Sequence, residues 1–490
     1  MDLTTEQLSI LAAGSGSSNL CIEALAGTGK TFMLSKLAPT LSAPTILALA
    51  FNVKAKDELA ARLPPSVIVK TLNGLGHGAW SQYVRRPLSV DSKKTWNLSQ
   101  ALQREMNIRF SKEENADISQ LVSTAKSQGW VPSGTPWPHS PLWPDTPEDL
   151  SDLFDLADVE ERDDYRTFLR ALMLKSIDSV YRNGLLDFND QLYMPVCFRA
   201  PFTKYHTTIV DEFQDLSALN HRMIEKSTSS RFIIVGDPNQ AIYAFRGALT
   251  SSFETFMDSK TFARFPLTTT FRCAKAIVRR QQDFVPDYNA APEAPEGEVR
   301  VFDSWTKASI PPGTTIICRN NAPLISLAFA LLRQGVPAQV LGTDIGKALE
   351  SSLNKATKGL GASAPTIEVT DRIEQFFRRE TAKAKTDRRR HSLADRRECL
   401  LALASNCPNL TAMRSACSSL FSNPDATILL SSGHKSKGLE WDTVIHLDPH
   451  LIPSKYARSP EALRQEDNLK YVIETRARTT LIIAYSEDFK

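Results

Sequence analysis

The sequence has no run of apolar residues long enough to cross a membrane. The longest candidate, Leu324–Leu332, has nine residues including a serine, against the roughly 18 that a membrane helix needs. The N-terminus carries Asp2 and Glu6 with no basic residue ahead of a short apolar patch, so a secretory signal is not expected. These absences disfavour a membrane protein and predict a soluble, cytoplasmic one.

Paired cysteines are also missing. The seven cysteines are scattered along the chain without a CxxC pair, which disfavours a disulfide framework and favours reduced thiols in a cytosol. Cys399, Cys407 and Cys417 form the only loose cluster, and no histidine lies at zinc-finger spacing from them. A zinc or iron–sulfur site is therefore not expected.

The overall balance of residues is that of a globular protein. Of the 490 residues, 42% are hydrophobic and 23% are charged, which excludes wholesale disorder and fibrous architectures. At about 150 residues per domain, this length predicts three or four units.

A net charge of +3 hides two blocks of opposite sign. Residues 378–397 hold nine Lys/Arg against three Asp/Glu, whereas residues 145–164 hold ten acids and one arginine. Such blocks are usually solvated faces. The basic block equally suits contact with the phosphates of a nucleic acid, and both interpretations stay open.

Two stretches of the chain alternate buried-strand and helical patterns. Continuous apolar strands of this kind, rather than alternating ones, indicate parallel sheets covered on both faces. The first stretch predicts strands at Asn19–Ala24, Thr45–Phe51, Val67–Leu72, Thr207–Val210, Phe232–Val235 and Phe265–Leu267. The second predicts strands at Val299–Phe302, Thr314–Cys318, Thr427–Leu430, Thr443–Leu447 and Thr480–Tyr485. Helices are expected at Thr31–Leu37, Lys54–Leu63 and Asn321–Arg333.

A proline-rich segment, Trp130–Pro147, lies between these patterns and is expected to be an irregular loop. Its tryptophans, Trp130, Trp137 and Trp143, have faces on which bases can stack. Anchoring of the loop on its own domain is the favoured interpretation.

The segment Ala24–Thr31 (ALAGTGKT) ends a predicted strand and opens a predicted helix. This is the phosphate-loop pattern, with alanine in place of the first glycine. Gly27 and Gly29 allow backbone N–H groups to surround a polyphosphate at a helix N-terminus. Lys30 is expected to reach the β- and γ-phosphates, and the Thr31 hydroxyl to hold Mg²⁺. The segment therefore predicts a nucleotide site.

The matching half of such a site is an acid at the end of a buried strand, and Thr208–Asp215 (TIVDEFQD) supplies it. Asp211 is expected to bind Mg²⁺ through water, while Glu212 orients and deprotonates the attacking water.

A third polar segment, Ile234–Ala248 (IVGDPNQAIYAFRGA), follows another buried strand. Gln240 is a candidate sensor of the γ-phosphate. Tyr243 and Phe245 alternate with Arg246, which suits stacking of unpaired bases beside a phosphate contact. Taken alone, a Tyr-x-Phe pair is more typical of a core, so both interpretations stay open.

Together these segments resemble a superfamily 1 helicase of the UvrD/Rep/PcrA group. The similarity covers both α/β stretches in the family's order. It is carried by LTTEQ at residues 3–7, ALAGTGKT, AFNVKA at 50–55, TLNGLG at 71–76, LLDFNDQL at 185–192, DEFQD, VGDPNQAIYAFRGA, LTTTFR at 267–272, TIICRNN at 315–321, ILLSSGHKSKGLEW at 428–441 and QEDNLKYVIETRA at 465–477.

The resemblance implies the parts of an ATP site. Gln7 would read the adenine, Phe271 would stack on it, and Glu440 would meet the ribose. Arg272 and Arg476 would act on the γ-phosphate, with Gln240 coupling hydrolysis to strand movement. The phosphate loop would contribute Ala26, Gly27, Thr28, Gly29, Lys30 and Thr31.

The resemblance also implies a channel for single-stranded DNA. The residues that would line it are Phe51, Thr71, Tyr243, Phe245, Arg246, His434 and Lys435. Several positions depart from the family pattern. Asn73 replaces a histidine, Ser432 a threonine, and Glu474 an apolar residue, while Phe245 and Phe271 stand where tryptophan and tyrosine are usual.

The predicted fold class is α/β, with two RecA-like domains facing each other across an ATP cleft. The first is expected at residues 1–76 and 186–270, with a helical insertion at 77–185. The second is expected at 271–344 and 426–490, with a short basic insertion at 345–425. That insertion is much shorter than its counterpart in relatives, and no room is expected for a C-terminal nuclease.

The sequence thus predicts an ATP- and Mg²⁺-dependent helicase that moves on single-stranded DNA, 3′ to 5′ by the resemblance. One alternative is a translocase that displaces proteins and unwinds weakly. A second is a regulatory subunit that uses ATP to gate a partner, such as a nuclease in a repair or defence complex. A small-molecule kinase is disfavoured, because no separate acceptor pocket is indicated.

Overall fold

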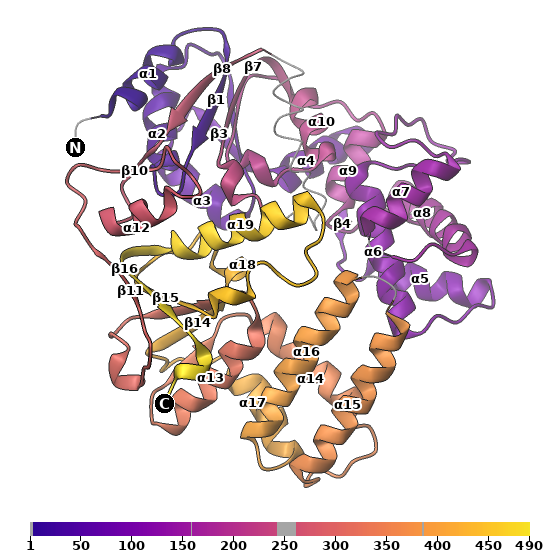
Figure 1. Cartoon of the computed structure of the whole chain (residues 1–490). Helices are drawn as coiled ribbons and strands as arrows, with labels where there is room; N and C mark the ends of the chain where they lie inside the picture. Colours follow the sequence, from indigo (N-terminus) through magenta and orange to yellow (C-terminus); the bar gives the residue numbers. More distant parts are fainter. Residues whose placement is uncertain (1–2, 158, 243–260, 385–386) are drawn as a thin grey trace. The chain divides into compact units, whose positions relative to one another are not determined.

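The computed structural model describes residues 3–157, 159–242, 261–384 and 387–490, which form two compact units (Figure 1). The first unit comprises Met1–Ala24 and Gly29–Leu267, and the second comprises Leu25–Thr28 and Thr268–Lys490. Each unit contains a six-stranded sheet whose neighbouring strands are all parallel. The predicted α/β class with two parallel sheets is therefore confirmed, while the finer division into two domains and two insertions stays a prediction.

The sheet of the first unit has the strand order β3-β2-β6-β7-β1-β8. Its strands are β1 (Asn19–Ala24), β2 (Ile46–Ala50), β3 (Val67–Thr71), β6 (Tyr205–Val210), β7 (Thr228–Gly236) and β8 (Phe262–Leu267). The central strands are almost entirely buried, as expected for a parallel sheet covered on both faces.

Helices surround this sheet and continue into a helical cluster (Figure 1). They are α1 (Thr5–Gly14), α2 (Lys30–Leu37), α3 (Val53–Arg62), α4 (Leu72–Val84), α5 (Lys94–Glu105), α6 (Lys112–Gln128), α7 (Pro147–Ala157), α8 (Asp163–Asn183), α9 (Asp190–Cys197) and α10 (Ala218–Ser227). A two-stranded ribbon, β4 (Ser89–Val90) with β5 (Leu185–Leu186), brackets the segment that holds α5 to α8.

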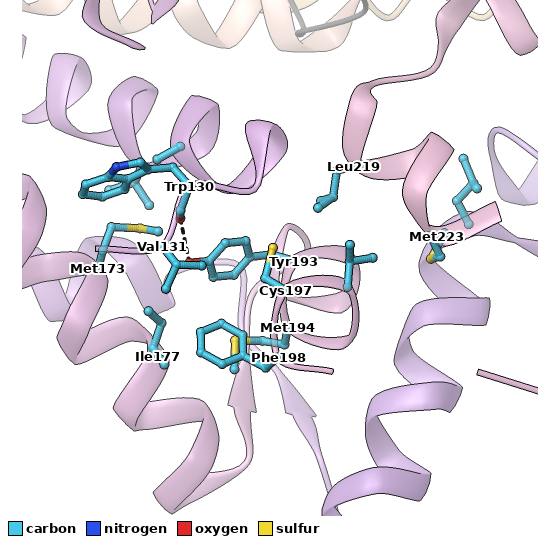
Figure 2. Close-up of a cluster of buried hydrophobic side chains, with 14 of the residues drawn as sticks. Trp130, Val131, Met173, Ile177, Tyr193, Met194, Cys197, Phe198, Leu219 and Met223 are labelled. Carbon is cyan, nitrogen blue, oxygen red and sulfur yellow. Dashed lines mark hydrogen bonds between the residues drawn. The ribbon is translucent and has the colours of Figure 1, made fainter. Parts of the chain in front are cut away.

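The proline-rich loop of the first unit is anchored by its own tryptophans. Trp130 lies in the buried cluster of Figure 2, where the hydroxyl of Tyr193 donates a hydrogen bond of 2.8 Å to its carbonyl. The Trp130 indole donates to Asp145, and Trp137 stacks on Tyr181 with ring centroids 4.0 Å apart. These contacts confirm the anchoring interpretation and leave base stacking by these rings unsupported.

The sheet of the second unit has the order β11-β16-β15-β12-β14-β13. Its strands are β11 (Glu298–Val301), β12 (Thr315–Cys318), β13 (Ala338–Val340), β14 (Ile428–Ser432), β15 (Trp441–Leu447) and β16 (Ala477–Ala484), beside a small ribbon of β9 (Thr269–Thr270) and β10 (Asn289–Ala290). The helices are α12 (Lys275–Gln281), α13 (Asn321–Arg333), α14 (Thr343–Ala356), α15 (Thr366–Lys383), α16 (Asp387–Asn406), α17 (Leu410–Ser419), α18 (Gly433–Ser436) and α19 (Pro460–Glu474). Neither β13 nor α12 was predicted.

Short 3-10 helices complete the two units. They are η1 (Ala38–Thr40), η2 (Phe213–Asp215), η3 (Pro238–Gln240), η5 (Lys307–Ser309), η6 (Pro449–Leu451) and η7 (Ser486–Asp488).

Several described residues of the two charged blocks are exposed, which leaves both interpretations of the basic block open. The basic block falls on α15 and α16, where Arg378, Arg379 and Arg390 are exposed and Arg397 pairs with Glu374. In the acidic block, some carboxylates are used in ion pairs within the unit. Among the described residues, no helix combines the length and apolarity that a membrane crossing requires. All seven cysteines are unpaired and buried.

Two glycines of α4 provide a test of the close packing between α4 and α9. A Cβ added at Gly76 would lie 2.1 Å from the carbonyl oxygen of Gln191, whereas one at Gly78 would meet nothing within 4 Å. We expect Gly76→Ala to destabilise the protein by about 1–3 kcal/mol, and Gly78→Ala to stabilise it by about 0.5–1 kcal/mol. Urea unfolding followed by circular dichroism measures both changes. Equal midpoints for the two variants would contradict the packing described.

Candidate nucleotide and DNA site

The candidate residues of the first unit gather at one edge of its sheet. Because all strands run parallel, their carboxyl ends meet at the same edge, where ligands of such sheets usually bind. β1 ends at Ala24 before the glycine-rich loop, while β6 and β7 lead into Asp211 and Asp237. β2 leads into Phe51, and β3 ends at Thr71.

The glycine-rich loop has the backbone geometry that only glycine adopts without strain. Gly27 and Gly29 have φ angles of +74° and +82°, and Gly29 is the N-cap of α2. A Cβ at Gly27 would lie 2.5 Å from both the Cβ of Arg272 and the Oγ1 of Thr270, its neighbours in the second unit. A side chain at Gly27 is therefore excluded by space as well as by conformation.

Lys30, the first residue of α2, forms an ion pair with Glu212. Its Nζ lies 2.7 Å from the Oε1 of Glu212. Burial lowers the pKa of Lys30, but the nearby carboxylates of Glu212, Asp211 and Asp237 outweigh that effect and the net pKa is raised. Glu212 has a left-handed φ of +51°, a conformation that carries strain in a residue other than glycine and is typical of functional sites.

A chain of hydrogen bonds continues from Glu212 to Gln240. The Nε2 of Gln214 donates to Glu212 at 2.6 Å, and its Oε1 accepts the backbone N–H of Asp237 at 3.1 Å. Asp237 then accepts a bond of 2.7 Å from the Nε2 of Gln240. With Lys30 included, groups from three separate sequence motifs therefore share one partly buried network.

Asp211 fits the role of a magnesium ligand. Burial and the adjacent charge of Glu212 raise its pKa to about 6, although Lys30 acts in the opposite direction. A cation beside this carboxylate would remove the free-energy penalty of ionising it. Carboxylate and hydroxyl oxygens, here those of Asp211 and Thr31, suit Mg²⁺, which usually keeps waters and phosphate oxygens as its other ligands. Among the described residues, no cluster of three or more His, Cys, Asp or Glu side chains is arranged to hold a metal.

The first half of the glycine-rich loop makes its contacts within the second unit. Both backbone groups of Ala26 are hydrogen-bonded there, the N–H to the hydroxyl of Tyr471 at 3.0 Å and the carbonyl to that of Tyr288 at 2.8 Å. The backbone N–H of Phe271 donates to the carbonyl of Gly27 at 2.9 Å. Three backbone atoms, the N–H and carbonyl of Ala26 and the carbonyl of Gly27, therefore hold the segment Leu25–Thr28 to the rest of the second unit.

Two candidate arginines of the second unit lie around Thr475. Arg272 donates to the Thr475 carbonyl and forms an ion pair with Glu440. The buried Arg476 donates to the carbonyls of Val472 and Leu439. Burial and the charge of Arg272 lower the pKa of Arg476 to about 10, so an anion near both guanidiniums would be stabilised.

Glu440 and Gln7 both form hydrogen bonds with neighbouring residues. Glu440 accepts hydrogen bonds from Arg272 and Arg478; burial alone would raise its pKa, but these two cations lower it. Gln7 closes a capping box at the start of α1, because its side chain accepts from Thr4 while its own N–H donates to the Thr4 hydroxyl. The ribose and adenine contacts assigned to these residues stay predictions.

Glu474, which departs from the family pattern, forms a buried polar network. Its carboxylate accepts bonds from Arg280 at 2.8 Å and Gln281 at 2.6 Å, and it lies 3.1 Å from the Nδ1 of His446. Burial alone would raise its pKa, but the hydrogen bonds from His446 and Arg280 lower it to about 2. The charge at this unexpected position is therefore matched by its neighbours.

The candidate DNA residues of the first unit line one region of the sheet edge. Ala50, which precedes Phe51, pairs with Thr71, the N-cap of α4. In the first turn of α4, Asn73 donates bonds of 2.9 Å to the Phe188 carbonyl and to the Gln191 side chain. The departure at Asn73 thus has a structural role.

Two other members of the predicted channel belong to the second unit. His434 and Lys435 lie on the short helix α18 of the second unit. Tyr243, Phe245 and Arg246 lie outside the described residues, so the choice between a stacking and a core role for these rings stays open.

Three residues of the site were missed from the sequence. Gln214 and Asp237 belong to the DEFQD and GDPNQ segments, and their polar side chains directly after a predicted buried strand were the available signal. Phe188 lies in the LLDFNDQL segment, where its two flanking aspartates predict a polar turn rather than a core position. Its side chain is 61% exposed, and that of Phe51 is 36% exposed.

A phosphate loop with a partner acid at the carboxyl edge of a parallel sheet defines a P-loop nucleotide-binding fold. The family described as "UvrD/REP helicase N-terminal domain" matches residues 3–261, and "UvrD-like helicase C-terminal domain" matches residues 351–488. The first match covers more than half of the 490 residues. The chain therefore belongs to the UvrD/Rep helicase family.

Individual relatives agree with this membership. F-box DNA helicase protein 1 of Schizosaccharomyces pombe is 26% identical over 491 residues, covering 95% of this chain and 55% of the relative. ATP-dependent DNA helicase UvrD2 of Mycobacterium tuberculosis is 23% identical over 559 residues, with coverage of 95% and 76%. Gabija protein GajB of Bacillus cereus is 30% identical over 123 residues, with coverage of 23% and 25%. The chain spans about half the length of the first of these relatives and a quarter of the last.

The raised pKa of Asp211 predicts a pH-dependent effect on stability. An acid whose pKa is higher in the folded than in the unfolded state destabilises the folded state only at pH values where the acid is ionised in the unfolded state. The penalty is absent below the unfolded pKa near 4 and complete above about 6. Without nucleotide, we expect Asp211→Asn to be more stable than the parent at pH 8 by the order of 1–3 kcal/mol, and by less at pH 5. Urea unfolding at both pH values measures the difference, and one that does not shrink at pH 5 would contradict the buried ionised carboxylate.

Proposed function

We propose that this chain is an ATP-driven motor that moves on single-stranded DNA and separates duplex strands. The observation that carries the proposal is the network from Lys30 through Glu212, Gln214 and Asp237 to Gln240. It joins the phosphate loop, the acidic segment and the third motif in one unit. Membership of the UvrD/Rep helicase family supports the same reaction.

Hydrolysis in this proposal uses the residues of the sheet edge. Lys30 binds the β- and γ-phosphates, and Glu212 orients the attacking water and accepts its proton. Asp211 and Thr31 hold Mg²⁺, which, when bound, neutralises charge on the phosphates. Lys30 and Glu212 form an ion pair with a separation of 2.7 Å. Arriving phosphates would compete for the Lys30 ammonium and release the Glu212 carboxylate for its role as base.

The second unit supplies the remaining groups of the proposal. Arg272 and Arg476 stabilise the charge on the transferred phosphoryl group. Burial and the nearby charge of Arg272 lower the pKa of Arg476 to about 10, so its charged form is destabilised. A phosphate beside the two guanidiniums would offset this destabilisation. Gln7 and Phe271 contact the adenine, and Glu440 the ribose, by the family resemblance.

Single-stranded DNA in this proposal binds at the edge that carries Phe51, Thr71 and Phe188. The exposed rings of Phe51 and Phe188 provide stacking faces for unpaired bases. Because every base has a π-face, such binding tolerates any sequence. Movement from 3′ to 5′ follows from the family resemblance.

One experiment tests the proposal as a whole. ATP turnover is measured with no nucleic acid, with single-stranded DNA, with single-stranded RNA and with blunt duplex. Strand separation is then followed on duplexes with a 3′ or a 5′ tail. We expect turnover to rise with single-stranded DNA and unwinding to require the 3′ tail. Turnover indifferent to DNA would contradict the motor, and strong stimulation without unwinding would favour the translocase or the partner-gated subunit.

Substitution of the proposed base separates ATP binding from hydrolysis. We expect Glu212→Gln to slow turnover by about 10²–10⁴-fold, the usual contribution of a general base, while ATP and single-stranded DNA still bind. Lys30→Ala is expected to abolish turnover by removing the phosphate contact. Single-turnover hydrolysis and nucleotide-binding assays measure the two effects.

Lys36→Ala is the matched control, because Lys36 lies exposed on the same helix, α2, as Lys30. Its turnover is expected to equal that of the parent. Near-normal turnover by Glu212→Gln would show that another group accepts the proton.

Truncation of the exposed ring tests the DNA edge. Loss of base–aromatic stacking worth about 1–3 kcal/mol predicts that Phe188→Ala weakens binding of an oligo(dT) strand by about 5- to 150-fold. Fluorescence anisotropy of a labelled oligonucleotide at fixed salt measures the dissociation constant.

Tyr83→Ala provides the comparison. Tyr83 is an exposed ring of the same unit, but it lies near the end of α4 that is opposite Thr71, about 18 Å away at 1.5 Å per residue. We expect its affinity for DNA to be unchanged. Equal losses for both variants would mean that Phe188 has no particular role.

A further inference from the structure

Four charged side chains are buried beneath the turn that presents Phe188. Lys94 begins α5, Lys126 lies in the last turn of α6, and Asp187 and Asp190 flank the exposed ring. Lys94, Lys126 and Asp190 have no exposed surface, and Asp187 is also buried. Two positive and two negative charges balance within the group, which is called the Lys–Asp cluster below.

Each lysine of the Lys–Asp cluster contacts an aspartate directly. The Nζ of Lys94 lies 2.6 Å from the Oδ2 of Asp190 and donates a second bond, of 2.9 Å, to the Ser176 carbonyl. The Nζ of Lys126 lies 2.6 Å from Asp187 and 2.7 Å from the Oδ1 of Asp190. Helices α5, α6 and α8 are thereby joined to the start of α9.

The two aspartates also close the turn on itself. The backbone N–H of Asp187 donates to the Asp190 carboxylate at 2.8 Å, and the N–H of Asp190 donates to the Asp187 carboxylate at 2.9 Å. Both oxygens of each carboxylate therefore have a donor or a cation. Two of these contacts tie the backbone of the turn that carries Phe188 directly to the two carboxylates.

The charge state of the cluster agrees with this geometry. Burial would raise the pKa of Asp187, but the ammonium groups of Lys126 and Lys94 hold it below its usual range. Burial lowers the pKa of Lys94, whereas the two aspartates raise that of Lys126 despite its burial.

Stability alone does not account for such a group. Replacing buried ion pairs by apolar residues of similar size is often neutral or stabilising, because desolvation of the charges offsets their attraction. The adjoining helix α9 is already anchored by apolar packing, with Tyr193, Met194 and Cys197 directed into the buried cluster of Figure 2. What the charges add is a fixed orientation of the turn.

We propose that Lys94, Lys126, Asp187 and Asp190 are positioning residues that hold Phe188 in the orientation in which it stacks on a base of single-stranded DNA. The inference rests on the proposed function of the same edge. The four residues are buried, so they act through Phe188 and do not touch the strand. A group that served only to pack the helices would have no such link to DNA affinity.

A double-mutant cycle measures that link. The dissociation constant for labelled oligo(dT) is determined for the parent, Lys126→Met, Phe188→Ala and the double variant, at a temperature where circular dichroism shows all four to be folded. We expect Lys126→Met to weaken binding at least threefold in the parent and by less than 1.5-fold in the Phe188→Ala background. Equal effects in the two backgrounds would overturn the proposal.

A milder variant keeps the test possible if Lys126→Met does not fold. The hydroxyl of Thr95 donates to Asp187 at 2.8 Å, and Thr95→Val removes that bond with little change of shape. We expect Thr95→Val to weaken oligo(dT) binding less than Lys126→Met does. As for Lys126→Met, this loss of affinity is expected to be smaller in the Phe188→Ala background than in the parent. Absence of any coupling in both cycles would overturn the proposal.

The control removes a lysine that has no place in the Lys–Asp cluster. Lys175 lies on α8 and pairs at the surface with Glu105, so Lys175→Met is expected to leave the oligo(dT) affinity unchanged. ATP turnover without DNA is expected to be equal in the parent and Lys126→Met, because Lys126 is no part of the nucleotide site.

The outcomes distinguish this inference from the proposed function. A parent protein that fails to bind oligo(dT) would refute the proposed function itself. A parent that binds, with Phe188→Ala equal to it, would overturn the role of Phe188 and the present proposal together. A loss in Phe188→Ala that is simply additive with Lys126→Met would overturn only the positioning role.

Discussion

The parallel direction of the strands is the constraint on which the site depends. In each unit, six strands run the same way, so every connection that leaves a carboxyl end emerges at one edge. Residues far apart in the chain, such as Lys30, Glu212 and Asp237, become neighbours for this reason. Buried apolar strands form the sheet, while polar turns beyond its edge hold the candidate residues. An antiparallel arrangement of the same strands would distribute these turns over two edges.

Much of this arrangement was predictable from local sequence. Strand β1 and helix α13 begin and end where their patterns predict, because a buried apolar run and a proline in the first turn leave few alternatives. The phosphate loop and the DEFQD segment were recognised because their chemistry is local. Strand β13, of three residues, and the short helix α12 were missed, since segments of this length carry too little periodicity to be distinguished from loops.

The parts that could not be predicted depend on contacts between distant residues. Nothing in the sequence around Gln214 shows that its amide joins Glu212 to Asp237. The Lys–Asp cluster draws its members from α5, α6 and the turn before α9, and isolated charges in a sequence favour exposure. The departures at Asn73 and Glu474 have partners that only the fold brings near. The roles of the ATP and DNA residues remain predictions, whereas their placement is now a basis for experiments.

The buried carboxylate of Glu474 limits how this chain can exchange segments with its relatives. The resemblance implies an apolar residue at the position of Glu474 in relatives, so a chimaera that imported a relative's counterpart of α19 would bring an apolar side chain to position 474. Arg280, Gln281 and His446 would then face a hydrocarbon surface in place of the acceptor that they contact now. Such an exchange therefore requires that the donor's residues at the positions of Arg280, Gln281 and His446 be transferred together with the helix, because the three regions α12, β15 and α19 share one buried set of contacts.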